Sequence, residues 1–219
     1  MQDGVCRHPA FRFWGKIVLD SSNPTCYIIA GPNGAGKTTF ANAYIASYIG
    51  GMGFLNVDNI AHDLNPDGVD NSANFEAGRI FLEQLDIMIE EEKDFAFETT
   101  LSGRFYIPKI KKWRSMGWSV VLYYLYLPSP AFSISRVRER VASGGHNIPM
   151  EAILRRYPRS LANLFLYSNV CDMTLCFDNS GREPIPIFEK IDGEEFNVLN
   201  EELFLKLKGG GKYNDENQR

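Results

Sequence analysis

The stretch "AGPNGAGKTTF", residues 30–40, decides the fold of this chain. Residues 31–38 within it fit the pattern GxxxxGK[ST] of a P-loop. Glycines let backbone N–H groups turn inward around a phosphate, and a following helix adds a partial positive charge. We therefore predict an ATP site in which Lys37 reaches the β- and γ-phosphates and the Thr38 hydroxyl binds Mg²⁺. The predicted nucleotide-binding residues are Gly31, Pro32, Asn33, Gly34, Ala35, Gly36, Lys37, Thr38 and Thr39.

Strand and helix patterns alternate on both sides of this loop. Apolar runs at 26–30, 53–58, 94–100, 118–127 and 173–177 predict strands, with helical spacing between them. Such alternation predicts an α/β, P-loop kinase-like fold with a mostly parallel five-stranded sheet and helices on both faces. The residues around Asp192-Gly193 predict a C-terminal β-hairpin. The expected divisions are a lead-in (1–24), a P-loop kinase domain (25–182), a hairpin extension (183–207) and a disordered tail (208–219).

Composition limits where in the cell the protein is expected and which kinds of partner it is expected to bind. A net charge of -4 argues against a general nucleic-acid binder, whose surface is usually basic. The longest apolar run, "VVLYYLYL" at 120–127, is too short to cross a membrane, and the first residues hold no apolar signal segment. The four cysteines have no metal-binding spacing. We therefore expect a cytoplasmic protein whose partners include neither nucleic acid nor a membrane.

Three classes of protein share the P-loop: transporter-type ATPases, switch GTPases and small-molecule kinases. "LSG" at 101–103 is not followed by Gly-Gln, as an ATPase signature would be, and the Asn-Lys-x-Asp stretch that reads guanine is absent. A kinase needs a base on the acceptor side and arginines that neutralise the transferring charge. Residue types suited to both roles are present, so the sequence favours a kinase.

Two carboxylates are candidates for the acceptor side. Asp58 lies at the C-terminal end of the second predicted strand, at the ligand-binding edge of the sheet, and could accept the proton of a substrate hydroxyl. Because Asp is also a preferred helix N-cap, a capping role is an equal alternative. Glu98 ends the third predicted strand, followed by Thr100 and Ser102. A carboxylate there is costly unless it binds Mg²⁺ water or substrate, or forms a hydrogen bond to the P-loop.

Arginines gather between residues 136 and 159. Arg136 and Arg140 are four residues apart and share one helical face, from which Arg138 is turned away. Three more arginines follow: Arg155, Arg156 and Arg159. The group predicts a lid at about residues 129–167 that clamps phosphates, although a solvated helix face would carry the same charges.

Several stretches together resemble the zeta-toxin-like P-loop kinases, in the branch described as predicted ABC-type ATPases. They are "AGPNGAGKTTF", "FLNVDNIAHDLNP", "FAFETTLSG", "RVRERVASGGHNIP", "RRYPRSLANL" and "FDNSG", and they cover about residues 25–182. The resemblance implies a kinase core related to nucleotide and shikimate kinases. Studied members phosphorylate UDP-N-acetylglucosamine on its sugar, and a small antitoxin holds them inactive by blocking the nucleotide site.

The resemblance also implies roles for single residues. It makes Asp58 the catalytic base, Glu98 and Thr100 substrate contacts, and Arg136 a phosphate-clamping residue with Arg140 as the alternative. Ser102 and His146 stand where the family has arginines, and the arginines at 155, 156 and 159 could compensate as substrate ligands.

These roles lead to a functional expectation. We expect transfer of the ATP γ-phosphate to a phosphorylated or nucleotide-linked sugar, in a toxin–antitoxin setting with a protein antitoxin as partner. The alternatives are a sugar or nucleoside kinase with no toxin role, and an ATP-binding switch module regulated by a partner.

Overall fold

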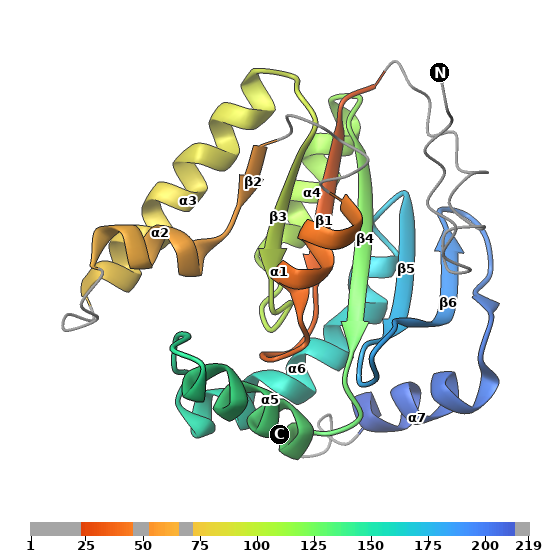
Figure 1. Ribbon diagram of the computed structural model, residues 1–219. Helices are drawn as coiled ribbons and strands as arrows, with labels where there is room; N and C mark the ends of the chain where they lie inside the picture. Colours follow the sequence, from red (N-terminus) through yellow and green to blue (C-terminus); the bar gives the residue numbers. More distant parts are fainter. Residues whose placement is uncertain (1–22, 46–52, 66–71, 213–219) are drawn as a thin grey trace, which may run out of the picture.

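The computed structural model describes residues 23–45, 53–65 and 72–212 (Figure 1). Nearly all of the predicted lead-in and the end of the predicted tail lie outside these residues. The helices are α1 (Lys37–Phe40), which continues as the π-helix η3 (Ala41–Ile45), α2 (Val57–Leu64), α3 (Ser72–Glu90), α4 (Tyr106–Ser115), α5 (Pro130–Ala142), α6 (Met150–Ser168) and α7 (Glu201–Lys212).

The strands form one seven-stranded sheet in the order β2-β3-β1-β4-β5-β6-β7. Their bounds are β1 (Thr25–Ala30), β2 (Gly53–Leu55), β3 (Phe95–Thr99), β4 (Ser119–Tyr126), β5 (Met173–Asp178), β6 (Ile185–Ile191) and β7 (Asn197–Val198). Strands β1 to β5 pair in parallel, which confirms the predicted α/β class. The β6–β7 hairpin continues this sheet in antiparallel fashion instead of standing apart. Because β5 is buried along its whole length, it needs a partner on its open edge, and β6 supplies it.

The C-terminal segment differs from the prediction. We predicted a hairpin extension to residue 207 and a disordered tail from 208, whereas helix α7 covers Glu201–Lys212. Phe204 and Leu207, three residues apart, are buried on its inner face, and Lys206 pairs with Glu202 on its outer face. This amphipathic spacing stabilises a helix in spite of the glycines near its end.

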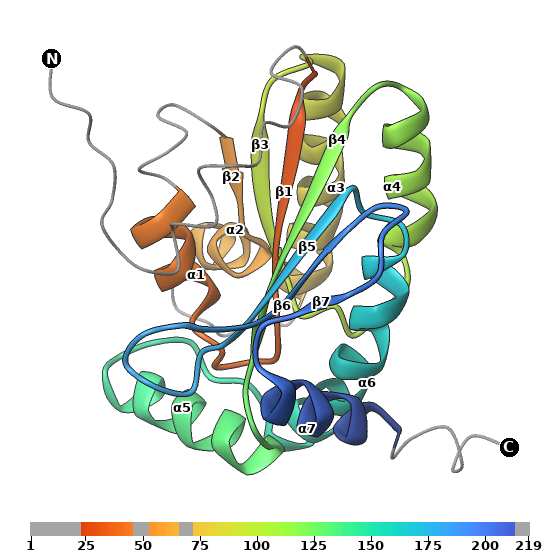
Figure 2. The same ribbon diagram turned by 90° about the vertical axis from the view of Figure 1, so that its right-hand side faces the viewer.

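The two faces of the sheet are covered by different helices, and β4 shows why (Figure 2). Successive side chains of a strand point to opposite faces. The Tyr123 ring packs against Phe40 of α1, at 6.0 Å between ring centroids. The Tyr124 hydroxyl lies 2.8 Å from the Ser160 hydroxyl of α6, on the other face. Helices α3 and α4 also cover this second face, where the Phe97 ring contacts Phe81 and Trp113.

Helix α5 begins as its sequence predicts. The Ser129 hydroxyl accepts a hydrogen bond from Phe132 N at 3.1 Å, and Pro130 occupies the first turn, where its missing N–H costs nothing. A proline inside a helix is expected to bend or interrupt it. Helix α6 is nevertheless continuous through Pro158, because a buried face that includes Tyr157 and Leu161 holds it. None of the described helices combines the length and the apolar character that a membrane crossing requires.

Arg114 ties the edge of the sheet opposite the P-loop together. Its guanidinium donates to the Asp172 carboxylate at 2.9 Å, to the Val170 carbonyl at 3.1 Å and to the Asp192 carboxylate at 2.6 Å. Asp172 precedes β5 and Asp192 lies in the β6–β7 turn, so α4, β5 and the hairpin meet at this side chain. The hydrogen bond from Arg114 lowers the pKa of the Asp192 carboxyl group below its usual value.

We expect Arg114→Met to lower the free energy of unfolding by about 1–2 kcal/mol at neutral pH, because charged hydrogen bonds are lost. A carboxyl group with a lowered folded-state pKa stabilises the protein above its unfolded pKa, near about 4, and loses this effect as the pH falls through the lowered value. Urea unfolding of parent and variant should therefore differ at pH 7 and converge at low pH. A difference independent of pH would contradict this explanation.

Candidate functional site

The P-loop joins the end of β1 to α1 and packs tightly against its surroundings. Gly31 has φ +144°, and a Cβ atom there would lie 2.3 Å from the Leu125 carbonyl oxygen. Gly34 has φ +77°, and a Cβ atom there would lie 2.9 Å from the Ser133 carbonyl oxygen and from Arg136 Cβ. Both positions therefore require glycine for their backbone conformation and for space. The first turn of α5 lies directly on the loop.

Two side chains from distant segments hold the outer side of the loop. The Ser133 hydroxyl of α5 donates to the Asn33 carbonyl, and the Asn179 amide, just after β5, donates to the Ala35 carbonyl at 2.7 Å. Gly36, at the N-cap of α1, makes no side-chain capping hydrogen bond. The start of α1 thus keeps backbone N–H donors that a phosphate can use.

The Lys37 ammonium group lies across the mouth of the loop. Its Nζ donates to the carbonyl oxygens of Gly31 at 3.1 Å and Pro32 at 3.2 Å. These bonds place a positive charge at the entrance of the cavity beside the loop.

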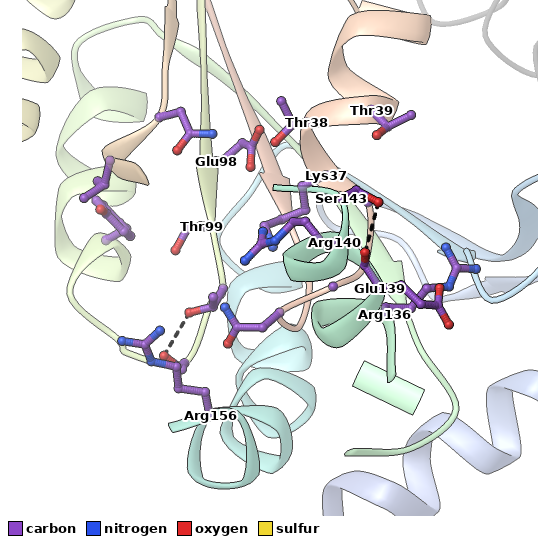
Figure 3. A pocket seen from close by; sticks show the side chains of 18 residues that line it. Lys37, Thr38, Thr39, Glu98, Thr99, Arg136, Glu139, Arg140, Ser143 and Arg156 are labelled. Atoms are coloured by element: carbon purple, nitrogen blue, oxygen red, sulfur yellow. Dashed lines mark hydrogen bonds between the residues drawn. The ribbon is translucent and has the colours of Figure 1, made fainter. Parts of the chain in front are cut away.

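A cavity of about 640 Å³ lies at the carboxyl edge of the sheet (Figure 3). This volume is within the usual range for a small-molecule site. The P-loop, the ends of β2 and β3, and helices α4, α5 and α6 all contribute to its lining. The lining residues are Asn33, Gly34, Gly36, Lys37, Thr38, Thr39, Asn56, Val57, Glu98, Thr99, Thr100, Ser102, Tyr106, Arg136, Glu139, Arg140, Ser143 and Arg156.

Most of the residues proposed from the sequence meet in this cavity. Those that line it are Asn33, Gly34, Gly36, Lys37, Thr38, Thr39, Glu98, Thr100, Ser102, Arg136, Arg140 and Arg156. Gly31, Pro32 and Ala35 are buried within the loop itself. Arg155 and Arg159 are exposed on α6 and do not line the cavity.

Asp58 lies in the first turn of α2, three residues beyond the end of β2, and not at the end of the strand as predicted. Its side chain lies outside the described residues. The Asn56 carbonyl accepts a hydrogen bond from Ile60 N at 3.1 Å, so Asn56 and not Asp58 holds the N-cap position. Asn56 and Val57 line the cavity, so α2 begins at its wall.

The two arginines of α5 have different surroundings. Arg136 donates to the Ser180 carbonyl at 2.8 Å, and its guanidinium carbon lies 5.3 Å from the centre of the Phe132 ring. Arg140 donates to the His146 carbonyl at 2.7 Å, while its Nε is buried with no hydrogen-bond partner among the described residues. In the view of Figure 3 the Arg140 side chain is drawn next to that of Lys37, and Arg136 is drawn further from Lys37. Arg140 is therefore the better placed of the two to contact a phosphate.

We expect Arg140→Gln to lower the rate of phosphoryl transfer by about 10²-fold, because it removes a charged donor beside the transferred group. Arg136→Gln should lower the rate by less than about tenfold, because that guanidinium is engaged by Ser180 and Phe132. Arg138→Gln, exposed on the same helix, is the control. Steady-state rates at saturating ATP test this order, and a larger loss at Arg136 would reverse the assignment.

The sequence did not single out every lining residue. Tyr106, Glu139 and Ser143 join the cavity only through folding, as Asn56 and Val57 do. Tyr106 opens α4, and its ring lies 5.0 Å from the Phe97 ring between centroids. Burial raises the pKa of the Tyr106 hydroxyl, so this group stays protonated at physiological pH.

Comparisons with known proteins agree with this geometry. The family model described as "Zeta toxin" matches residues 14–171, more than half of the chain. A protein of Haemophilus influenzae, described only as an uncharacterized protein, is 30% identical over 129 residues, which are 58% of this chain and 88% of that protein.

Solved structures share the fold at low sequence identity. A crystal structure of AvrRxo1-ORF1:AvrRxo1-ORF2 with sulphate ions matches with a TM-score of 0.65 at 17% identity over 84% of this chain. The chain spans only 63% of the length of that protein. The same complex with ATP gives 0.65 at 18% identity. A structure of the PezAT chromosomal toxin–antitoxin system of Streptococcus pneumoniae gives 0.58 at 14% identity and covers 87% of each chain.

Proposed function

The chain belongs to the zeta toxin family and is a P-loop kinase, and from this we propose that it phosphorylates a sugar hydroxyl. The phosphate donor is ATP, and the acceptor is a phosphorylated or nucleotide-linked sugar of the UDP-N-acetylglucosamine kind. One observation carries the proposal: a single cavity joins the P-loop, the polar end of β3 and the arginines of α5 and α6. Donor and acceptor can therefore lie side by side in one cavity.

Lys37 and Arg140 serve the donor in this proposal. Their charges neutralise the β- and γ-phosphate oxygens, and the backbone N–H groups at the start of α1 hold the remaining oxygens. The likeness to a complex solved with ATP agrees with this use of the loop. Phosphoryl transfer depends mainly on such positioning and charge stabilisation.

The lining residues also fit a magnesium ion. Among the described residues no group of three histidine, cysteine, aspartate or glutamate side chains is arranged as a metal site. Mg²⁺ bound with a nucleotide does not need one, because it takes one or two protein ligands, phosphate oxygens and water. The Thr38 hydroxyl and the Glu98 carboxylate line the same cavity and would hold it. The chemistry that Mg²⁺ would supply at these two residues is neutralisation of the negative charge on the transferred phosphate.

Asp58 is the proposed base on the acceptor side. It accepts the proton of the sugar hydroxyl while that oxygen bonds to the γ-phosphorus and the bond to the ADP oxygen breaks. Glu98 and Thr100 offer the hydrogen bonds that suit a polyhydroxylated ring. The position of α2 at the cavity wall supports this role.

A protein antitoxin is the proposed partner. The likeness to the PezAT structure, which comes from a toxin–antitoxin system, supports this partnership. A partner seated over the cavity would exclude ATP, so it should compete with a fluorescent ATP analogue for the protein.

The test is transfer from labelled ATP to a panel of nucleotide sugars, sugar phosphates and nucleosides. We expect product on a nucleotide sugar or a sugar phosphate. Product on nucleosides alone would be consistent with a kinase but would contradict a sugar acceptor. ATP hydrolysis with no labelled acceptor would favour a partner-regulated switch module.

A further inference from the structure

Arg156 differs from other arginines near the carboxyl edge of the sheet. It reaches the cavity from α6 and is half-buried, yet it forms no hydrogen bond or ion pair with any described residue. Arg104, Arg136 and Arg140 each have a hydrogen-bond partner. A half-buried guanidinium has lost part of its hydration, and without a carboxylate partner no ion pair offsets this cost. An anionic ligand would supply the missing partner.

Two hydroxyl groups line the same cavity at the end of β3. The Thr100 and Ser102 hydroxyl oxygens lie 3.0 Å apart and form a hydrogen bond. Leu101, between them, has φ +57° and is 1% exposed. This left-handed conformation costs a leucine about 1–2 kcal/mol, so its surroundings must hold it. The turn lets both hydroxyls line the cavity. While they are bonded to each other, one of the two protons is free for an anion, and opening that bond frees the second.

Helix α6 holds this turn. Asn163, which is 4% exposed, donates from Nδ2 to the Leu101 carbonyl at 2.8 Å. Its Oδ1 accepts from Arg104 Nε at 3.0 Å. The Tyr167 hydroxyl donates to the Gly103 carbonyl at 2.9 Å, and burial raises the pKa of Tyr167 to about 12, so the proton stays in place.

Arg156 and Asn163 are seven residues apart, which places them on the same face of α6, two turns from each other. The same helix therefore carries the Arg156 guanidinium and the Asn163 amide that holds the turn with the two hydroxyls. The anchor is made by buried groups, so it is present before any ligand arrives.

We propose that α6 builds an anion-binding subsite for the acceptor, separate from the P-loop. Arg156 supplies the charge, Thr100 and Ser102 supply hydrogen bonds, and Asn163 is a positioning residue that holds their turn. The ligand is a phosphate or diphosphate group carried by the acceptor, because a guanidinium fork with two hydroxyls matches its oxygens. The hydroxyls alone would also suit a sugar ring, so the positive charge of Arg156 is what favours an anionic group here. The inference rests on the proposed function for the name of the acceptor, but the anion site can be tested by itself.

The first experiment measures binding of inorganic pyrophosphate by calorimetry, with the P-loop saturated by a non-hydrolysable ATP analogue and Mg²⁺. We expect the parent to bind and Arg156→Gln to lower the affinity by at least about tenfold. Arg138→Gln, exposed on α5, should bind as the parent does. Equal pyrophosphate affinity in Arg156→Gln and the parent would overturn the subsite.

The second experiment separates positioning from stability. Asn163→Ala should raise the KM of a phosphorylated acceptor by about tenfold and leave the KM of ATP within about twofold, because only the acceptor turn is released. Ser160→Ala is the matched control. Ser160 lies on the same helix as Asn163, and its replacement removes a buried hydrogen bond to Tyr124 of β4 without touching that turn. A KM for the acceptor that is unchanged in Asn163→Ala, or raised equally in Ser160→Ala, would refute the positioning role.

The two experiments distinguish this inference from the proposed function. Pyrophosphate binding that depends on Arg156, without labelled product on any sugar, would support the subsite and contradict the proposed sugar kinase function. Efficient transfer to an unphosphorylated sugar by both the parent and Arg156→Gln would support kinase activity and contradict the proposed subsite.

Discussion

Lys37→Ala is expected to lower phosphoryl transfer by at least about 30-fold, or about 2 kcal/mol of transition-state stabilisation. The ammonium group lies at the mouth of the P-loop, held by the carbonyl oxygens of Gly31 and Pro32. When phosphates enter, the ammonium group can turn to form ion pairs with their oxygens, with little rearrangement of the loop. Alanine removes the charge and leaves the loop glycines in place. The measurement is single-turnover transfer at saturating ATP, together with ATP affinity by calorimetry.

Lys93→Ala serves as the control for Lys37→Ala. Lys93 is exposed, pairs with Glu91 and lies before β3, at the far edge of the sheet. Its loss removes one positive charge from the protein without approaching the cavity. Transfer by Lys37→Ala within a few-fold of the parent would rule out the proposed role of the P-loop, provided that both variants unfold at similar temperatures.

Asp58→Asn is expected to lower transfer by roughly 10²–10⁴-fold, the usual range for loss of a general base. Asparagine has nearly the same size but cannot accept the hydroxyl proton. Because the substitution leaves the P-loop and α5 unchanged, ATP affinity should stay near that of the parent. Rates across pH give a second readout, since the basic limb of the profile should persist and the acidic limb should disappear.

Asp63→Asn, exposed five residues later on α2, is the matched control. An acidic residue in the first turn of a helix also stabilises that helix through its dipole. If Asp58→Asn keeps its transfer rate and only lowers the melting temperature, Asp58 serves α2 and is not the base.

Local sequence patterns were sufficient for the class of the protein. The P-loop is contiguous, and its strand, glycines and lysine act on one ligand within eleven residues, so spacing alone predicts its use. The alternation of apolar strands and helices likewise predicts a parallel α/β sheet. The boundary at Asp58 was predicted less well, because β2 is short and α2 begins only two residues after it.

The arginines show where sequence reasoning stops. Helical spacing puts Arg136 and Arg140 on one face, and it cannot tell which of them contacts a phosphate. The carbonyl of Ser180, 44 residues further along the chain, engages Arg136. Similarly, three arginines follow one another in "RRYPR", but only Arg156 lines the cavity. The rotation of α6 decides this, and that rotation is set by buried residues such as Tyr157, Leu161 and Leu164.

The sequence by itself was sufficient to predict a P-loop nucleotide site in an α/β core, because those features depend on neighbouring residues and on short periodic patterns. Only the tertiary structure decided which charges face the cavity, how the hairpin joins the sheet, and how Asn163 of α6 holds the turn at Leu101. The contact between Asn163 and Leu101 joins residues 62 positions apart. Its formation depends on how whole helices pack on the sheet to bury their apolar faces, and a local pattern carries no record of that packing.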